Sequence, residues 1–319
     1  MTKLSLLAVS GMTLLASGVV CAQAYPSRPV RIVIAAGVGT PDDFNVRLIA
    51  PKLGELLGQQ FVADNRPGAA GLIGQTFAAN APPDGYTLLF AGGSITGSKY
   101  VNANFRFDVL RDFTPVSLIA LGKFVLVTHP NVPAQNVKEL IALARSRAGK
   151  LTYATTGPGQ TPFWNALMFI HMAGIKAVEI PYKNSSESMI DVIAGRVDYY
   201  FSGSVAAVTN RAKLRVLAVT SATRSSAFPG VPTIAEAALP GYDMPSWGSL
   251  IGPAGIPREI VNALNAAVVR TLGMPDVRER FLTVGTEPAP STPEGLSKQF
   301  ADWVDRYGKL AKLAGIKPQ

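Results

Sequence analysis

The stretch from Val30 to Arg47, VRIVIAAGVGTPDDFNVR, constrains the fold more than any other part of the chain. Its apolar first half predicts a short strand, and the glycines that follow predict a turn. Thr40 suits the N-cap of a helix, Pro41 suits the first helical position, and Asp43 completes a capping-box-like pattern. Such a strand–loop–helix unit points unpaired backbone N–H groups and the positive end of a helix dipole at one spot, which favours an anion.

The same arrangement returns between Leu151 and Asn165, which read LTYATTGPGQTPFWN. A strand is followed by the turn Gly157-Pro158-Gly159, and the pair Thr161-Pro162 marks the start of a helix. Strands and helices alternate around both units, which is typical of a parallel or mixed sheet covered by helices. We therefore expect two α/β lobes, each presenting an anion-friendly helix N-terminus.

The order of the remaining elements indicates which residues belong to each lobe. Further strands are predicted at 61–63, 87–91, 116–120, 124–128, 178–181, 197–201, 216–220 and 249–251. The end of the chain is predicted to be helical, at 257–272, 275–282 and 293–313, as expected of a chain that returns to its first lobe. The expected division is lobe 1 at 25–124 plus 246–319, and lobe 2 at 125–245.

The first 24 residues have the pattern of a signal peptide rather than of the fold. Lys3 begins a short positive region, an apolar run follows to Val20, and Ala22-Gln23-Ala24 is an A-x-A cleavage site. A retained membrane anchor and a lipoprotein acylated at Cys21 are the alternatives, but the run is short and Val20 is a poor residue before a lipidated cysteine. Cleavage after Ala24 would export a chain without cysteine, and so without disulfides or thiolate chemistry.

The charge pattern excludes one class of partner. The formal net charge is +9, which weakly favours an acidic solute or an anionic membrane surface. The basic residues are scattered, with no run of five and no basic stripe interleaved with aromatic residues. We therefore expect no nucleic-acid partner.

The chain has few residues in patterns that are typical of catalysis. His129 and His171 are the only histidines, and no metal-ligand spacing, phosphate-binding loop or G-x-S-x-G elbow is present. Asp42 and Asp43 form a carboxylate pair, but a helix start explains both. We expect no cofactor, no metal and no enzymatic activity. An exported hydrolase remains an alternative, to be tested at Ser94 or Ser202.

Nine short motifs, in order from Tyr25 to Pro318, carry a resemblance to a known family. They are YPSRPVR at 25–31, NRPGAAG at 65–71, PDGYTLL at 83–89, DFTPVS at 112–117, KLTYA at 150–154, PYK at 181–183, LRVLAVT at 214–220, VPT at 231–233 and AGIK at 314–317. Each motif alone is weak, whereas the ordered set is highly specific. The chain resembles the periplasmic solute-binding proteins of tripartite tricarboxylate transporters, the Bug-type receptors.

The resemblance implies a type II periplasmic-binding-protein fold, with two α/β lobes, a double crossover hinge and a ligand in the cleft. It implies a small organic acid as ligand and the membrane subunits of the transporter as partner, and we expect a monomer. A ligand-sensing partner of a periplasmic sensor domain is the alternative with the same fold. By position, the carboxylate-binding residues of the family correspond to Val38, Gly39, Thr40 and Asp43 in the first loop, and to Thr155, Thr156, Gly157, Gly159 and Thr161 in the second.

Four departures from the family pattern concern the ligand rather than the fold. Ala35-Ala36 replaces Pro-Phe, and Gly39-Thr40 replaces a glycine pair, so Thr40 either narrows the pocket or offers a hydroxyl. Phe163 stands where the family often has histidine, and would admit an aromatic or apolar ligand unless it is helix core. Ser202 stands where the family often has aspartate, which argues against an amino-acid ligand. With Ser94, in the loop after the strand at 87–91, these residues complete the expected ligand-binding set.

Overall fold

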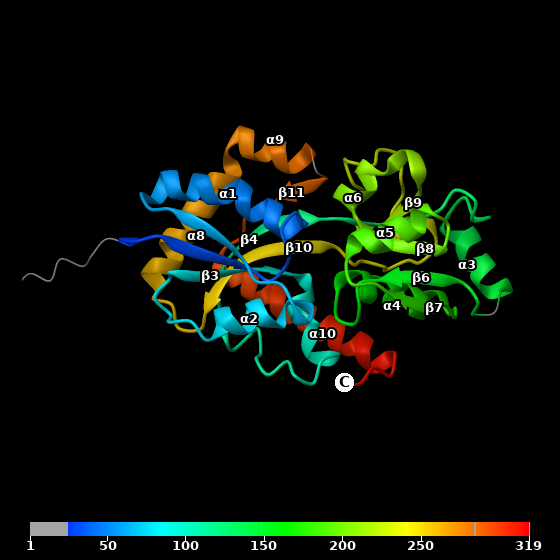
Figure 1. The fold of residues 1–319 in the computed structure, drawn as a ribbon, viewed down its shortest axis with the longest axis horizontal. Helices are drawn as coiled ribbons and strands as arrows, with labels where there is room; N and C mark the ends of the chain where they lie inside the picture. The colour runs from blue at the N-terminus through cyan, green and yellow to red at the C-terminus, as the bar shows by residue number, and fades with distance from the viewer. Residues whose placement is uncertain (1–24, 148, 284, 319) are drawn as a thin grey trace, which may run out of the picture.

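The computed structural model describes residues 25–147, 149–283 and 285–318. The expected signal peptide and Cys21 lie outside these ranges. The chain forms two β-sheets with helices packed on them, and the two sheets lie side by side along the long axis (Figure 1). The predicted α/β class is therefore confirmed.

The first sheet has six strands in the order β11-β4-β10-β3-β1-β2. Strands β1, β2 and β3 are parallel, and β10 runs antiparallel to β3 and β4, as β11 does to β4. The bounds are β1 Val30–Ile34, β2 Phe61–Asn65, β3 Thr87–Gly92, β4 Phe113–Gly122, β10 Ser246–Pro253 and β11 Thr286–Pro288.

The second sheet has five strands in the order β7-β6-β8-β5-β9. Strand β6 is parallel to β7 and β8, and β5 is antiparallel to β8 and β9. The bounds are β5 Phe124–Thr128, β6 Thr152–Thr155, β7 Val178–Pro181, β8 Tyr199–Gly203 and β9 Arg215–Val219. Both sheets are mixed, as the alternation of strands and helices predicts.

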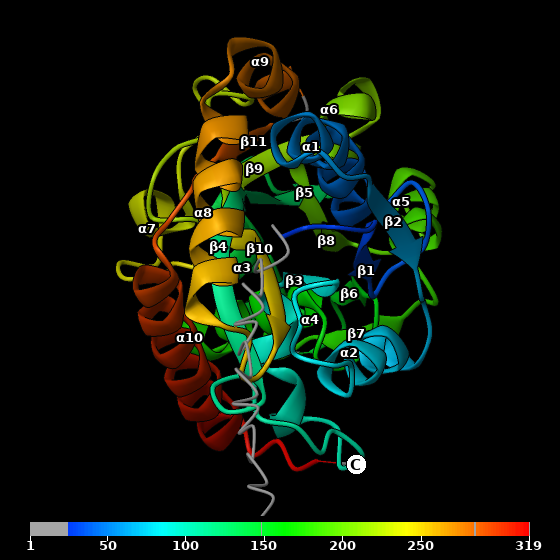
Figure 2. The same ribbon diagram turned by 90° about the vertical axis from the view of Figure 1, so that its left-hand side faces the viewer.

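The helices cover the faces of the two sheets (Figure 2). Helices α1, α8 and α9 contact one another beside the first sheet, and α10 packs on β4 and reaches α4 of the second. The bounds are α1 Pro41–Leu57, α2 Leu72–Ala79, α3 Val137–Ser146, α4 Thr161–Ala173, α5 Ser185–Ile193, α6 Ser204–Thr209, α7 Ile234–Ala237, α8 Arg258–Gly273, α9 Pro275–Thr283 and α10 Pro293–Leu313. No helix in the described part of the chain is both long and apolar enough to span a membrane.

The chain passes between the two sheets twice. The first crossing joins the end of β4 at Gly122 to the start of β5 at Phe124, and the second joins β9 to β10. This double crossover is the one implied by the family resemblance. Because β4 and β10 both reach the crossing, their ends define the edge of the first sheet that faces the second.

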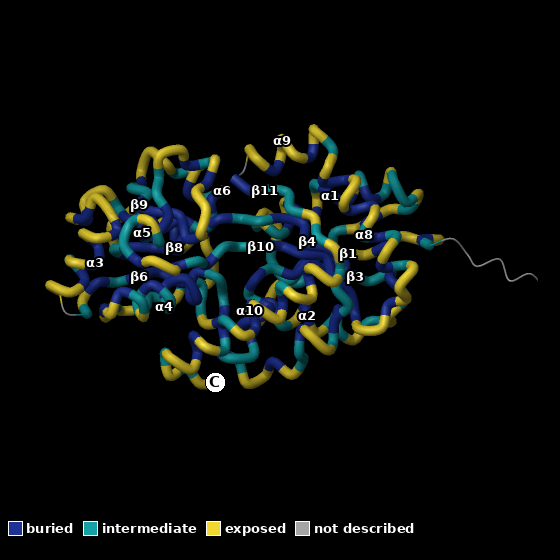
Figure 3. Tube along the Cα trace, turned by 180° about the vertical axis from the view of Figure 1, so that it is seen from behind, coloured by how far each residue is buried: buried dark blue, intermediate teal, exposed yellow. Residues whose placement is uncertain are grey.

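Buried residues run through both sheets (Figure 3), and one apolar cluster has members in each of them. A large apolar cluster includes Trp247 in the first sheet, Tyr199 in the second, and Trp164 of α4 and Tyr307 of α10. The rings of Trp164 in α4 and Tyr307 in α10 are 4.7 Å apart, centroid to centroid. The C-terminal helix therefore connects the two halves of the molecule, in addition to the two crossings.

Several elements differ from the sequence prediction, and strands β10 and β11 show the reason most clearly. Strand β10 has eight residues, Ser246–Pro253, where three were expected, because it lies between β3 and β4 and pairs with both. Strand β11 falls in a part of the chain that we expected to be only helical. Its three residues join the sheet through antiparallel pairing with β4, which is a long-range contact that local patterns do not reveal.

Candidate functional site

The two predicted loops lie at the edges of the sheets that face each other. In the first sheet, Gly92 at the end of β3 pairs with Gly248 near the start of β10, and β1 ends in the same direction as β3. In the second sheet, Gly203 at the end of β8 pairs with Phe124 at the start of β5, and β6 runs parallel to β8. The β1–α1 loop and the β6–α4 loop therefore both follow strands that end at the crossing.

The first loop has the predicted N-cap and proline, but the reciprocal bond of a capping box is replaced by one from the Gly39 N–H to Asp43. Thr40 has extended backbone (φ −75°, ψ 162°), and its Oγ1 accepts a hydrogen bond from the N–H of Asp43, 3.4 Å away. The Thr40 hydroxyl donates in turn to the carbonyl of Gly37 at 2.8 Å. Pro41 follows as the first helical residue, where its missing N–H costs nothing. The Thr40 hydroxyl therefore links the turn at Gly37 to the first turn of α1.

The Asp43 carboxylate holds the first loop in place through hydrogen bonds. Its carboxylate accepts hydrogen bonds from the N–H of Gly39 and from Nε of Arg47, each at 2.9 Å. Arg47 also donates to Asn65 at 3.0 Å, and Asn65 donates to the carbonyl of Ala36 at 3.2 Å. Burial opposes ionisation of Asp43, but the bonds from Arg47 and Gly39 outweigh it and hold the pKa of Asp43 below its usual value. The residue supports the loop and leaves little of its carboxylate free.

Backbone donors remain at the mouth of the first loop. The N–H groups of Val38, Thr40 and Asp42 have no acceptor within hydrogen-bonding distance among the described residues. The Val38 side chain is 74% exposed, and Gly39 takes the left-handed conformation with φ +80°. An incoming anion would therefore meet exposed N–H groups and the positive end of the α1 dipole.

The second loop is built differently. Thr155 is fully buried, and its hydroxyl donates to Glu179 at 2.6 Å and accepts from the N–H of Gly157 at 3.2 Å. Gly157 has φ +94°. Helix α4 begins at Thr161, but its N-cap residue is Gln160, whose side chain makes no capping bond. The N–H groups of Thr156 and Thr161 have no acceptor within bonding distance in the described chain.

The second loop also touches the first half of the molecule. The Gln160 side chain donates to the carbonyl of Ala70 at 3.0 Å. A Cβ atom added to Gly159 would lie 2.8 Å from Val101. Gly159 is therefore needed for close packing between the halves, and its backbone is largely covered. Sequence reasoning missed Gln160 and Ala70, because their pairing depends on how the halves dock.

The other expected ligand-binding residues divide into accessible and buried positions. Ser94, in the short 3₁₀ turn Gly93–Thr96 after β3, is half-buried and borders this edge. Phe163 is only 6% exposed and packs edge-to-face on Trp164 with ring centroids 5.4 Å apart. Ser202 is fully buried, and its hydroxyl donates to the carbonyl of Gly203 at 3.1 Å. The structure thus favours helix core for Phe163 over an aromatic ligand wall.

Asp42 was attributed above to the helix start alone, yet its side chain has an unusual setting. A Cβ atom on Gly92 would lie 3.4 Å from Asp42 Oδ2 and 3.8 Å from the carbonyl oxygen of Trp247. The carboxylate is partly buried at this place, and no donor or cation among the described residues pairs with it. Burial raises the pKa of Asp42 to about 6. Sequence could not reveal this, because Gly92 and Trp247 are remote in the chain.

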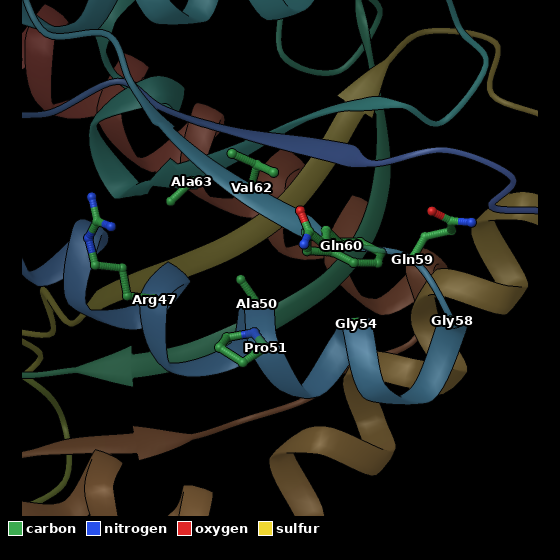
Figure 4. A pocket seen from close by; sticks show the side chains of 10 residues that line it. Arg47, Ala50, Pro51, Gly54, Gly58, Gln59, Gln60, Val62 and Ala63 are labelled. Carbon is green, nitrogen blue, oxygen red and sulfur yellow. The ribbon is translucent and has the colours of Figure 1, made fainter.

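A separate cavity lies farther along α1 than the β1–α1 loop. It is an open groove of about 770 Å³ along α1 and the edge strand β2, lined in part by Pro51, Gly54, Gly58 and Gln60 (Figure 4). Its lining residues are uncharged apart from Arg47. We place the candidate site at the facing loops, where the free backbone donors are, rather than in this groove.

Residues 45–316 match the family described as "Tripartite tricarboxylate transporter family receptor". The chain belongs to this family. Protein BugT of Bordetella pertussis is 31% identical to it, with 99% of each chain covered. Since the family is one of receptors, the chain is a solute-binding protein rather than an enzyme. The alternative of an exported hydrolase is therefore wrong.

Solved structures agree with this assignment. An R. palustris protein solved with adipate has 34% identity and a TM-score of 0.85, covering 92% of this chain and all of the other. The periplasmic binding protein BugD has 28% identity and a TM-score of 0.83, with 92% and 100% covered. MatC from Rhodopseudomonas palustris, solved with bound malate, has 28% identity and a TM-score of 0.81, with 90% and 100% covered. The periplasmic-binding-protein fold is therefore shown.

Proposed function

We propose that this receptor captures a small organic acid between the β1–α1 and β6–α4 loops and delivers it to the membrane subunits of a tripartite tricarboxylate transporter. The observation that carries the proposal is the pair of loops with free N–H groups at the facing ends of the two sheets. The neighbours that hold adipate and malate support a carboxylate as the ligand.

The proposed working form is a monomer in the periplasm, cut after Ala24. Its lobe 1 comprises 25–124 and 246–319, and its lobe 2 comprises 125–245. The distribution of strands between the two sheets supports this division. Ligand that bridges the loops stabilises the closed form through contacts that the open form lacks, so that binding shifts the population of the two forms.

The proposed roles follow from the accessibility of each residue. Val38, Thr40, Thr156 and Thr161 offer backbone donors, while Gly39 and Gly157 allow the backbone to approach the ligand. Ser94 borders the site and offers a hydroxyl. The remaining expected residues act from behind the site: Asp43 and Thr155 hold the loops, Gly159 packs the halves together, and Phe163 and Ser202 fill the core.

Thermal unfolding against a panel of acids tests the proposal. The panel comprises succinate, glutarate, adipate, malate, citrate, amino acids and aromatic acids, each with its uncharged amide. Ligand at a hundred times its Kd should raise the unfolding free energy by about 2.7 kcal/mol, which is a readily measured shift in Tm. A shift with an acid and none with its amide is expected. Absence of any shift, also after unfolding and refolding to remove bound ligand, would contradict the function.

Substitutions in both loops test the mechanism. Gly39→Asp and Gly157→Asp place a negative charge among the proposed donors and should abolish binding of the best acid from the panel. Gly39→Asn and Gly157→Asn are the matched controls, because they impose the same strain at a positive φ without the charge. If the aspartate and asparagine variants bind equally well, charge complementarity at the loops is not the basis of recognition.

A further inference from the structure

Asp42 is a carboxylate in the proposed site that opposes its anion-binding character. It lies in the first turn of α1, where backbone N–H groups attract anions. Its carboxylate lies against the end of β3 beside Gly92, near the carbonyl of Trp247, where β10 enters from the crossing. The ionised side chain would repel a second carboxylate brought to this place.

Helix capping does not account for Asp42. Thr40 caps the helix, and Asp43 binds the Gly39 N–H and Arg47. Asp42 makes no such bond to any described residue, although burial makes an unpaired charge costly. A partly buried carboxylate without a partner, at an edge that receives ligand, is best explained by a partner that the ligand brings.

We propose that Asp42 is a specificity-determining residue that selects acids which also carry a protonated nitrogen. The inference rests on the proposed function, since it needs an acid to bind at these loops. The ligand carboxylate would take the free N–H groups, and its ammonium would pair with Asp42. This arrangement gives a partner both to the ligand carboxylate and to Asp42, whereas a plain dicarboxylate leaves Asp42 without one.

On the opposite sheet, Glu179 is a carboxylate beside the second loop, and it already accepts the hydrogen bond of the Thr155 hydroxyl at 2.6 Å. Ser202, at the position where the family often has aspartate, is buried with its hydroxyl bonded to the carbonyl of Gly203. In the β1–α1 loop, Asp43 is already paired with Arg47 at 2.9 Å. Among these carboxylates of the described residues, Asp42 is the one that makes no hydrogen bond or ion pair, and it is thus left to receive a cation. The expectation that Ser202 argues against an amino-acid ligand is thereby outweighed.

Matched pairs of acids test the inference by calorimetric titration of the mature protein. The probes are glutarate with L-glutamate, succinate with L-aspartate, and butyrate with 4-aminobutyrate. We expect the nitrogen-bearing member of at least one pair to bind at least ten times more tightly. Asp42→Asn should reduce that preference to about threefold or less. Asp302→Asn, an exposed position on α10, is the control and should keep it.

The outcomes separate this inference from the proposed function. If plain acids bind as tightly as their amino counterparts, or if Asp42→Asn keeps the preference, the role of Asp42 is refuted and the function stands. If no acid of either kind binds, both fail. A thermal unfolding curve for each variant confirms that it is folded before titration.

Discussion

Replacing Asp42 with asparagine should make the ligand-free protein more stable at neutral pH. Burial raises the pKa of this carboxyl from 3.8 to about 6, so the folded state resists its ionisation. A pKa raised from 3.8 to about 6 corresponds to about 3 kcal/mol. Because the side chain is partly exposed, solvent screening reduces this, and we expect about 1–2 kcal/mol of stabilisation at pH 7.5. Asparagine keeps the shape of aspartate without the charge.

The stability difference between Asp42→Asn and the wild type should change with pH in one direction. Between pH 4 and 6 the folded protein keeps the proton on Asp42, whereas the unfolded chain has largely lost it. The unfolded state then binds fewer protons, so this group lowers the unfolding free energy as the pH rises through that window. The advantage of Asp42→Asn over the wild type should therefore grow between pH 4.5 and 7.5.

Urea denaturation of the refolded, ligand-free proteins measures this advantage at both pH values. Carboxylates with lowered pKa, such as Asp43, act in the opposite direction, but they are common to both proteins and cancel in the difference. Asp302→Asn should show no such change. A constant difference between wild type and Asp42→Asn, or one that shrinks as the pH rises, would mean that Asp42 has a charge partner.

Two further substitutions test the connection between the halves. Lys123, at the first crossing, is 7% exposed, and its Nζ lies 3.0 Å from Glu287 on β11. Lys123→Met should lower the unfolding free energy, measured by urea denaturation, by about 1–3 kcal/mol. A loss under about 0.5 kcal/mol would show that this ion pair contributes little. Gly97→Ala would place a Cβ 2.6 Å from the Trp164 indole, so we expect a lower Tm and weaker ligand binding. Gly203→Ala meets no atom within 4 Å and should leave both unchanged; equal effects of the two alanines would refute the packing argument.

The local features of the fold were predictable from sequence. The cap at Thr40, the proline at position 41 and the helix end at Gly58 depend on neighbours a few residues away. The last helix, at 293–313, was predicted with its observed bounds because its apolar residues fall on one face. The family resemblance supplied the double crossover, which local patterns do not give.

The features that depend on docking were not predictable. Burial of Phe163 and Ser202 is set by packing within the second half, and the contact of Gln160 with Ala70 by the approach of the two halves. Asp42 looked like an ordinary first-turn acid, because the strand end that covers it lies about fifty residues away in sequence. The two loops could therefore be predicted from the sequence, whereas only the structure shows which of their backbone N–H groups lack an acceptor among the described residues.

A crystal structure of the protein with its best acid bound would test the two-loop capture most directly. We predict that the ligand carboxylate lies within about 3 Å of backbone N–H groups from both the β1–α1 and the β6–α4 loops. An acid seated in the groove along α1 and β2, or held by one loop alone, would contradict the mechanism.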